Sequence, residues 1–165
     1  MNEFVEHTFK PIYNDKSKVL ILGTMPSPKS RENGFYYSHP QNRFWRVISE
    51  LYNKKLPRTN NEKIKLLLDC HIALWDVLKS CNINGADDSS IKNPVVNDIN
   101  GLLEHTNICI VFTTGAKASS LYKKYCSESI KIPSIALPST SPANCRFYNF
   151  DSLKESYKII KYYTD

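Results

Sequence analysis

Apolar residues gather in short runs along this chain, separated by polar segments. The first run, Val19-Leu20-Ile21-Leu22, is apolar at every position and stops at Gly23. A run without alternation predicts a parallel strand that is covered on both faces. Three further strands are predicted by similar runs over residues 71–76, 108–112 and 135–137.

Between these strands, apolar residues recur at helical spacing. A helix over about residues 42–52 is predicted by Phe44, Val47, Ile48 and Leu51, which lie three or four positions apart. Other helices are predicted over residues 61–69, 116–126 and 151–163. Asn93 as an N-cap, with Pro94 at the first helical position, predicts another helix that ends near His105. Residues 81–93 are predicted to form a polar loop, and the residues before Lys16 an irregular lead-in.

Strands that alternate with helices predict βαβ units. The expected fold is therefore α/β, a three-layer α/β/α sandwich with a central four-stranded, mainly parallel sheet, built as one domain over residues 1–165. Ligands of such folds bind at the carboxyl ends of the strands. The unusual loops all follow predicted strands, after Leu22, Trp75, Phe112 and Leu137.

Charge and composition narrow the choice of partner. The formal net charge is +6 and the sequence pI is about 9.0, which favours a polyanionic partner without establishing one. Residues 35–46 interleave five aromatic side chains with two arginines, a combination that suits stacked bases and phosphates.

Cysteine usage bears on the compartment and on metals. The five cysteines are an odd number without a C-x-x-C pair, which argues against a disulfide framework, a zinc ribbon and an iron–sulfur cluster. We therefore expect reduced thiols, a cytoplasmic protein and no metal. The first residues show no signal peptide, and no apolar run approaches the length of a membrane span, so we expect no membrane partner.

Three separated motifs identify a family. They are Gly23-Thr24-Met25-Pro26-Ser27, then Gly34-Phe35-Tyr36-Tyr37-x-His39-Pro40-x-Asn42-x-Phe44-Trp45, and downstream Leu137-Pro138-Ser139-Thr140-Ser141-Pro142-Ala143-Asn144. Together they resemble the DNA-deoxyinosine (hypoxanthine-DNA) glycosylase branch of the uracil-DNA glycosylase superfamily, with matching signals also at residues 73–81. The resemblance covers most of the chain.

This resemblance implies a monofunctional DNA glycosylase that removes deaminated bases, hypoxanthine first, and leaves an abasic site. No lysine stands where a Schiff base to the sugar would form, and no cofactor is expected. DNA is the implied partner, and we expect a monomer. Two alternatives remain open: an enzyme that prefers uracil or xanthine, and a non-catalytic nucleic-acid-binding module on the same fold.

Two departures from the wider superfamily shape the predicted chemistry. Met25 stands where relatives carry an acid or an asparagine, and Leu137 where they carry histidine or asparagine. By resemblance, Asn42 is then the residue that positions the attacking water, acting through orientation because an amide is a weak base. His39 either donates to the base or caps the following helix.

The remaining predicted residues form a base pocket and a DNA contact surface. The predicted pocket consists of Gly23, Thr24, Met25, Pro26, Ser27, the stacking ring of Tyr37, and Asp76, which either accepts from the base or caps a turn. The predicted DNA contacts are Lys29, Arg43, Ser139, Thr140, Ser141, Pro142, Ala143 and Asn144, the last six in a stiff loop suited to a minor groove.

Overall fold

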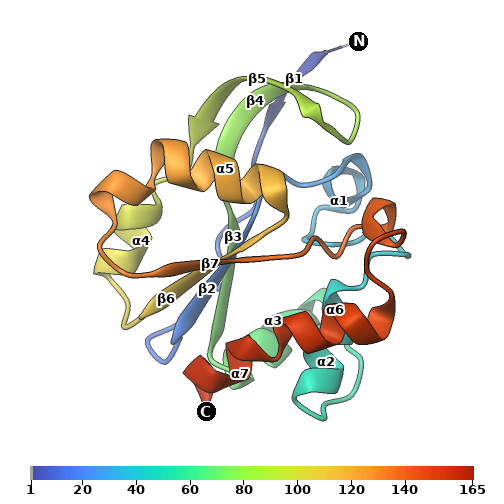
Figure 1. Cartoon of the computed structure of the whole chain (residues 1–165), viewed down its shortest axis with the longest axis vertical. Coiled ribbons are helices and arrows are strands. Elements are labelled where there is room, and N and C mark those ends of the chain that lie inside the picture. Colours follow the sequence, from blue (N-terminus) through green and yellow to red (C-terminus); the bar gives the residue numbers. More distant parts are fainter. Residues whose placement is uncertain (1) are drawn as a thin grey trace.

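The computed structural model describes residues 2–165 and centres on a four-stranded parallel sheet (Figure 1). Its strands, in spatial order, are β3 (Ile72–Asp76), β2 (Val19–Gly23), β6 (Ile110–Thr114) and β7 (Ser134–Leu137). Val19 pairs with Ile72 on one side and with Ile110 on the other. All four strands run the same way, so their carboxyl ends meet at one edge. The parallel sheet predicted from the apolar runs is confirmed.

Strand β2 shows why its sequence is apolar at every position. Val19 and Ile21 pack into the hydrophobic core on one face of the sheet, whereas Leu20 and Leu22 pack into a second core on the other face. All four side chains are completely buried. A strand between two cores needs apolar residues on both faces, because its side chains alternate between them.

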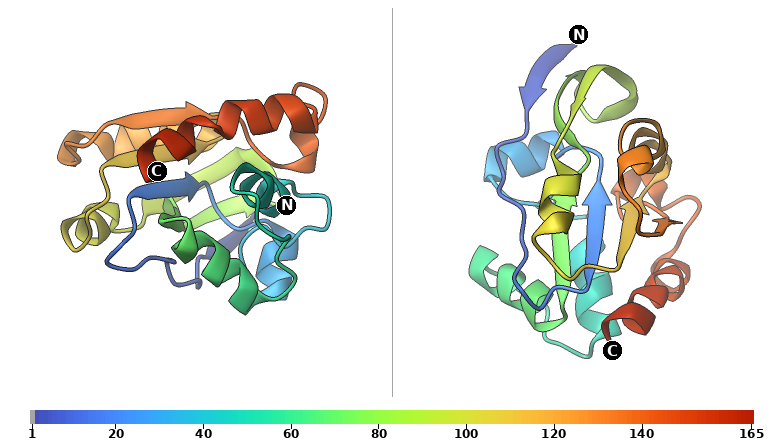
Figure 2. Two further views of the ribbon diagram at one scale, coloured as in Figure 1. Left: turned by 90° about the horizontal axis from the view of Figure 1, so that it is seen from below. Right: turned by 90° about the vertical axis from the view of Figure 1, so that its left-hand side faces the viewer.

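Helices cover both faces, which confirms the α/β/α sandwich (Figures 1 and 2). The core of Val19 and Ile21 is covered by α2 (Phe44–Leu51), α3 (Asn60–Asp69), α6 (Phe150–Tyr157) and α7 (Ile159–Thr164). The core of Leu20 and Leu22 is covered by α4 (Ile99–Glu104) and α5 (Ala116–Tyr125), which the short 3-10 helix η1 (Ser127–Ser129) follows. The single predicted carboxyl-terminal helix is in fact α6 and α7, which meet at Lys158. None of the helices within the described residues has the length and apolar character that crossing a bilayer requires.

The loop after β2 contains a short helix that the sequence analysis did not predict. Helix α1 (Pro28–Asn33) begins after Ser27, whose hydroxyl oxygen accepts the N–H of Ser30 at 3.2 Å. Pro28 stands at the first helical position, where the missing N–H costs nothing. The helix ends at Gly34, which has a φ of 72°.

A second sheet corrects three of the predictions. It is antiparallel, with the order β1 (Glu3–Glu6), β4 (Leu78–Asn84) and β5 (Asp87–Val96). The predicted irregular lead-in is therefore wrong at β1, and the predicted polar loop 81–93 is a hairpin, turned at Gly85 with a φ of 59°. Figure 2 shows this hairpin beyond the end of the parallel sheet at which β3 ends.

The helix predicted to start at Asn93 is also wrong. Asn93 and Pro94 lie in β5, at the edge of the small sheet, where a strand tolerates a residue without an N–H. Asn93 has a φ of 53°, and the pairing of β4 with β5 is interrupted by register shifts. Helix α4 starts only at Ile99, after Asp98, whose carboxylate accepts the N–H of Gly101 at 3.0 Å.

Candidate active site

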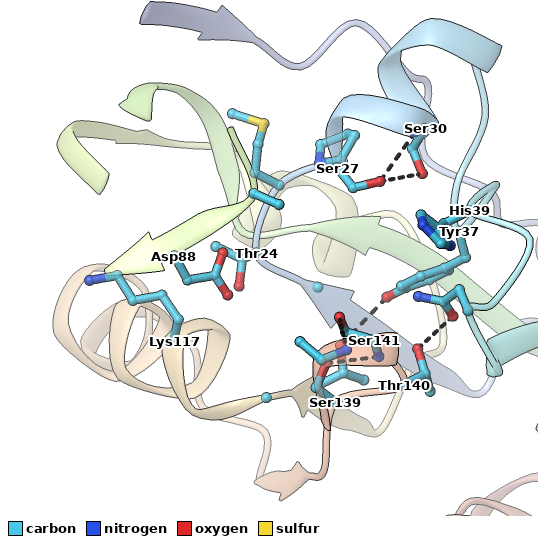
Figure 3. Close-up of a pocket in the computed structure, with 18 of the residues that line it drawn as sticks. Thr24, Ser27, Ser30, Tyr37, His39, Asp88, Lys117, Ser139, Thr140 and Ser141 are labelled. Atoms are coloured by element: carbon cyan, nitrogen blue, oxygen red, sulfur yellow. Dashed lines mark hydrogen bonds between the residues drawn. The ribbon is translucent and has the colours of Figure 1, made fainter. Parts of the chain in front are cut away.

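The loops at the carboxyl ends of all four parallel strands enclose one cavity of about 1110 Å³. Every residue predicted for the site lines it except Arg43 and Asn144. In Figure 3, Thr24 and Ser27 border the same space as Tyr37 and His39, with the loop from Ser139 to Ser141 opposite. Segments that are more than a hundred residues apart in the sequence are thus brought together.

Asn42 is held by two hydrogen bonds to its amide oxygen. It lies just before α2, and its Oδ1 accepts the N–H of Phe44 at 2.9 Å and the hydroxyl of Thr140 at 2.8 Å. A carbonyl oxygen has two lone pairs, so this oxygen is saturated. The Nδ2 group donates to no residue among 2–165, so Asn42 offers the cavity a hydrogen-bond donor of fixed orientation.

His39 lies in the turn before α2 and lines the same cavity. Its Nδ1 accepts the N–H of Gln41 at 3.1 Å, and its backbone carbonyl accepts the N–H of Asn42 at 2.9 Å. Because Nδ1 is an acceptor, the neutral ring carries its proton on Nε2. His39 therefore stabilises the local turn and also has a ring N–H left to donate.

Tyr37 supplies a rigid aromatic ring to the cavity. It has a φ of 50°, and its ring stacks on Phe44 with centroids 4.3 Å apart and an angle of 17° between the planes. Its hydroxyl lies 3.5 Å from Oγ1 of Thr114. Burial, and then the negative charge of Asp76, raises the pKa of Tyr37 well above its ordinary value, so the phenol stays protonated.

Asp76 forms a buried pair with His7, a residue that the sequence analysis did not consider. The two side chains are 5% and 1% exposed, and Nε2 of His7 lies 2.9 Å from Oδ2 of Asp76. A Cβ added at Gly23 would come within 2.4 Å of Oδ1 of Asp76, so only glycine fits beside this carboxylate. The sequence carried no signal for His7, because 69 residues separate it from its partner.

The loop after β7 is stiffened by its own hydrogen bonds. Asn144 donates its amide to the carbonyl of Ser139 at 3.0 Å, and the hydroxyl oxygen of Ser141 accepts the N–H of Ala143 at 3.3 Å at the start of the 3-10 helix η2 (Pro142–Asn144). Arg43 points its guanidinium at the carbonyls of Tyr148 and Ser141. We propose that Arg43 and Asn144 shape this loop, and that the residues exposed to the cavity contact DNA.

Sequence reasoning missed one wall of the cavity. The β4–β5 hairpin contributes Gly85, Ala86, Asp88 and Ser89. Across from it, Lys117 lies in the first turn of α5, close enough to act on Asp88 electrostatically (Figure 3). Buried and exposed residues largely alternate in β4, and this alternation could have predicted a strand. The polar residues of β5, which follow directly, instead indicated a loop.

The loop that carries Met25 offers backbone donors. The amide N–H groups of Thr24 and Met25 donate to no group among residues 2–165, and both residues line the cavity. The carbonyls of Gly23 and Thr24 accept the N–H groups of Val77 and Leu78, at 2.8 and 3.1 Å, which fixes the loop against the end of β3. Within the part of the chain described, no three His, Cys, Asp or Glu side chains are grouped so as to hold a metal ion.

Comparisons with known proteins find similar sequences and a similar fold. The family model of the uracil DNA glycosylase superfamily matches residues 10–162. A protein of Methanosarcina acetivorans named hypoxanthine DNA glycosylase is 32% identical over 145 residues, 87% of this chain and 90% of that protein. A protein of the same name from Methanosarcina barkeri is 31% identical over 112 residues, 67% of this chain and 71% of that protein. The solution NMR structure of a Methanosarcina acetivorans protein superposes with a TM-score of 0.79 at 28% identity, covering 96% of this chain and 99% of that one.

Proposed function

This chain belongs to the uracil DNA glycosylase superfamily, and we propose that it is a DNA glycosylase that hydrolyses the N-glycosidic bond of deaminated bases in DNA, hypoxanthine first. The observation that carries the proposal is the placement of Asn42, Tyr37 and the backbone of Thr24 and Met25 around one cavity, in a chain similar to two hypoxanthine DNA glycosylases. The cavity is large enough for an extruded nucleotide.

The reaction begins when the target nucleotide leaves the DNA stack. Extrusion costs a few kcal/mol, and stacking on an aromatic ring returns about 1–3 kcal/mol per base. Tyr37 is suited to this role because its ring is already held flat against Phe44. The loop from Ser139 to Ala143, on the opposite wall, is suited to hold the DNA backbone or to enter the minor groove.

In the chemical step, the bond between the sugar C1′ and the base nitrogen breaks, and its electron pair leaves with the base. A water oxygen forms a bond to C1′ and loses a proton to solvent, and the departing base anion takes up a proton in turn, which yields an abasic site and the neutral free base. Negative charge grows on the base, so hydrogen-bond donors aimed at it stabilise the transition state. The free amide N–H groups of Thr24 and Met25 are candidates for these donors.

Asn42 acts by orientation in this scheme. Its saturated oxygen leaves only the Nδ2 group free, which can donate to a lone pair of the attacking water and fix its position. His39, with its free Nε2–H, is a second donor to the water or the leaving base. An uncharged amide suffices because the base departs readily once its charge is hydrogen-bonded.

We further propose that the enzyme is monofunctional, is a monomer, and works in the cytoplasm without metal or cofactor. Two lysines line the cavity. Lys29 is partly exposed on α1 and pairs with Glu32 at 3.7 Å, and Lys117 lies near the carboxylate of Asp88, so neither suits an amine that must attack a sugar. All five cysteines are free thiols, which suits a reducing compartment. Light scattering tests the monomer, and a rate unchanged by EDTA tests the metal.

The test of the function is a duplex with one deoxyinosine, incubated with the protein and then treated with alkali. Wild-type protein should give alkali-labile breaks, with no cleavage before the alkali. Asn42→Ala should lower the single-turnover rate by about 10²-fold or more, the typical effect of removing one fixed donor. Asn100→Ala, which removes an amide on α4 outside the cavity, serves as the matched control.

The outcomes separate the alternatives. If the protein binds DNA but produces no breaks in any substrate, the result would favour the non-catalytic nucleic-acid-binding module. If uracil or xanthine is released faster than hypoxanthine, from single or double strands, the proposed base preference would be wrong but the proposed enzyme class would still hold. Full activity in Asn42→Ala would remove the catalytic assignment alone.

A further inference from the structure

A second hollow lies beside the cavity and plays no part in the mechanism above. It has a volume of about 460 Å³ and lies between α3, the chain that follows α1, and residues 8–13, which pair with the edge strand β3. We call it the side pocket. Tyr36 lines both the side pocket and the cavity, so the two share a wall. The lining is largely apolar and includes Phe9, Pro11, Tyr13, Phe35, Ile64 and Leu68.

Aromatic rings supply much of this lining. Tyr36 is fixed in place, because its hydroxyl donates to the carbonyl of Lys10 at 2.8 Å. The rings of Phe9 and Phe35 pack edge-on against it, with centroids 5.1 and 5.7 Å away. Tyr13 differs from these three, since its ring is 43% exposed and contacts no other ring among residues 2–165. An exposed ring at the side of a pocket is open to stacking by a ligand.

The free charges at the side pocket are positive. Lys10 belongs to its lining, and Lys63 of α3 holds its ammonium 5.6 Å from the ring centroid of Phe35. Within residues 2–165, neither lysine pairs with a carboxylate and no acid lines the pocket. The nearby acids of α3, Glu62 and Asp69, already have other hydrogen-bond partners. The side pocket therefore suits a ligand that combines negative charge with flat apolar groups.

Burial of Lys63 points to the same kind of ligand. Burial lowers the pKa of this amine below its ordinary value, because the charged form loses water. A bound anion would offset that effect, since it favours the charged amine. The side pocket thus gains most from a ligand whose anionic group reaches Lys63.

Single-stranded DNA has the required chemistry. Proteins that bind it without sequence preference combine cations for the phosphates with aromatic rings on which bases stack. Because the side pocket and the cavity share Tyr36, a strand that delivers a nucleotide to the cavity is the polyanion nearest to the side pocket. An acidic peptide of a partner protein would also match the charges, but it has no need to bind beside the cavity.

We propose that the side pocket is an accessory subsite for a nucleotide that flanks the target in the substrate strand, with Tyr13 stacking on its base and Lys10 and Lys63 holding its phosphate. This inference rests on the proposed glycosylase function, since it places the flanking strand relative to a nucleotide in the cavity. Stacking and phosphate contacts do not distinguish bases, so the subsite accepts any of them.

Oligonucleotides extended on one side test the subsite. Single strands with one 2′-fluoro-2′-deoxyinosine, in which the electron-withdrawing fluorine slows cleavage, are lengthened stepwise on the 5′ or the 3′ side over roughly 4 to 16 nucleotides. The affinity, measured by fluorescence anisotropy, should rise by about fivefold or more on one side only. Spacers without bases in the extension should remove most of this gain, because they leave phosphates but nothing to stack.

Two variants separate stacking from charge. Tyr13→Ala should reduce the affinity for the long strand by about 5- to 160-fold, the value of one stacked base, whereas Tyr13→Phe should bind like wild type. Lys63→Ala should lower the slope of log affinity against log salt by about 0.7, the value of one phosphate contact to a single strand. Lys65→Ala removes an exposed lysine of the same helix that pairs with Asp69, and as the matched control it should leave the slope unchanged.

Several results would overturn the subsite. They are an affinity that does not depend on length on either side, a folded Tyr13→Ala variant that binds the longest strand as tightly as wild type, and equal changes of slope in Lys63→Ala and Lys65→Ala. Displacement of the extension by an acidic peptide of glutamate and phenylalanine would assign the side pocket to a partner protein instead. Circular dichroism confirms which variants are folded. Inactivity of wild-type protein on every deaminated base would overturn the glycosylase function itself.

Discussion

Thr140→Val isolates the contact that orients Asn42. Thr140 is 2% exposed, and its hydroxyl donates to Oδ1 of Asn42 at 2.8 Å. Valine has nearly the same shape, so the change removes the hydroxyl and little else. Asn42 then keeps only the N–H of Phe44 on its oxygen and gains freedom to rotate.

The size of the effect follows from that single bond. A neutral hydrogen bond contributes about 0.5–1.5 kcal/mol, and 1.36 kcal/mol corresponds to a tenfold change in rate, so we expect a decrease of roughly 2- to 12-fold. The loss should appear in the single-turnover rate on a deoxyinosine duplex, with little change in DNA affinity. Thr140→Ser, which restores the hydroxyl, should recover most of the rate.

A double-mutant cycle decides what Thr140 does. If it acts through Asn42, then Thr140→Val should cost nothing further in the Asn42→Ala background, because the partner is already gone. If it contacts DNA instead, as its place in the loop after β7 first indicated, the same loss should appear in both backgrounds and in the affinity for duplex. Equal losses in the two backgrounds would refute the orientation argument.

Three other predictions follow from packing and titration. Gly23→Ala would place a methyl group 2.4 Å from a fixed carboxylate oxygen, so we expect a loss of about 1–3 kcal/mol in the free energy of unfolding, measured in urea, together with reduced cleavage. Burial raises the pKa of the Cys70 and Cys126 thiols from 9.0 to about 11, so between these two values the folded state keeps protons that the unfolded state releases. The free energy of unfolding, measured by urea titration, should therefore be at its full value below pH 9 and decrease between pH 9 and 11. The decrease should be less steep in Cys70→Ala, which has one buried thiol fewer. A thiol reagent at pH 8 should label the exposed Cys109 and Cys145 at once and the buried thiols only upon unfolding, a pattern that mass spectrometry reads directly.

The parallel sheet could be predicted because its signal is local. Successive residues of the run from Val19 to Leu22 are buried on opposite faces of the sheet, so the run alone indicates a hydrophobic core on each face. The carboxyl ends of parallel strands necessarily share an edge, and the cavity at that edge followed from the strand assignments. Most of the predicted site residues reached the cavity for this reason.

The antiparallel hairpin could not be predicted in the same way. Its outer strand β5 is mostly exposed, so it lacks the apolar alternation that marks a strand. Asn93 and Pro94 also imitate a helix start, since an asparagine followed by proline suits an N-cap as well as an edge strand. In the structure, antiparallel pairing with β4 makes this segment a strand rather than a helix start. That pairing joins two segments, so it cannot be predicted from either one alone.

Hydrogen bonding inside the cavity was beyond the sequence for a different reason. Residue types name the donors and acceptors, but only contacts decide which remain free. Asn42 has both a donor and an acceptor, and Thr140 together with the amide of Phe44 uses up the acceptor. Asp76 has two acceptors, and His7 uses one. The cavity is thus lined by a free donor at position 42 and a free acceptor at position 76, and the residue types alone do not reveal this.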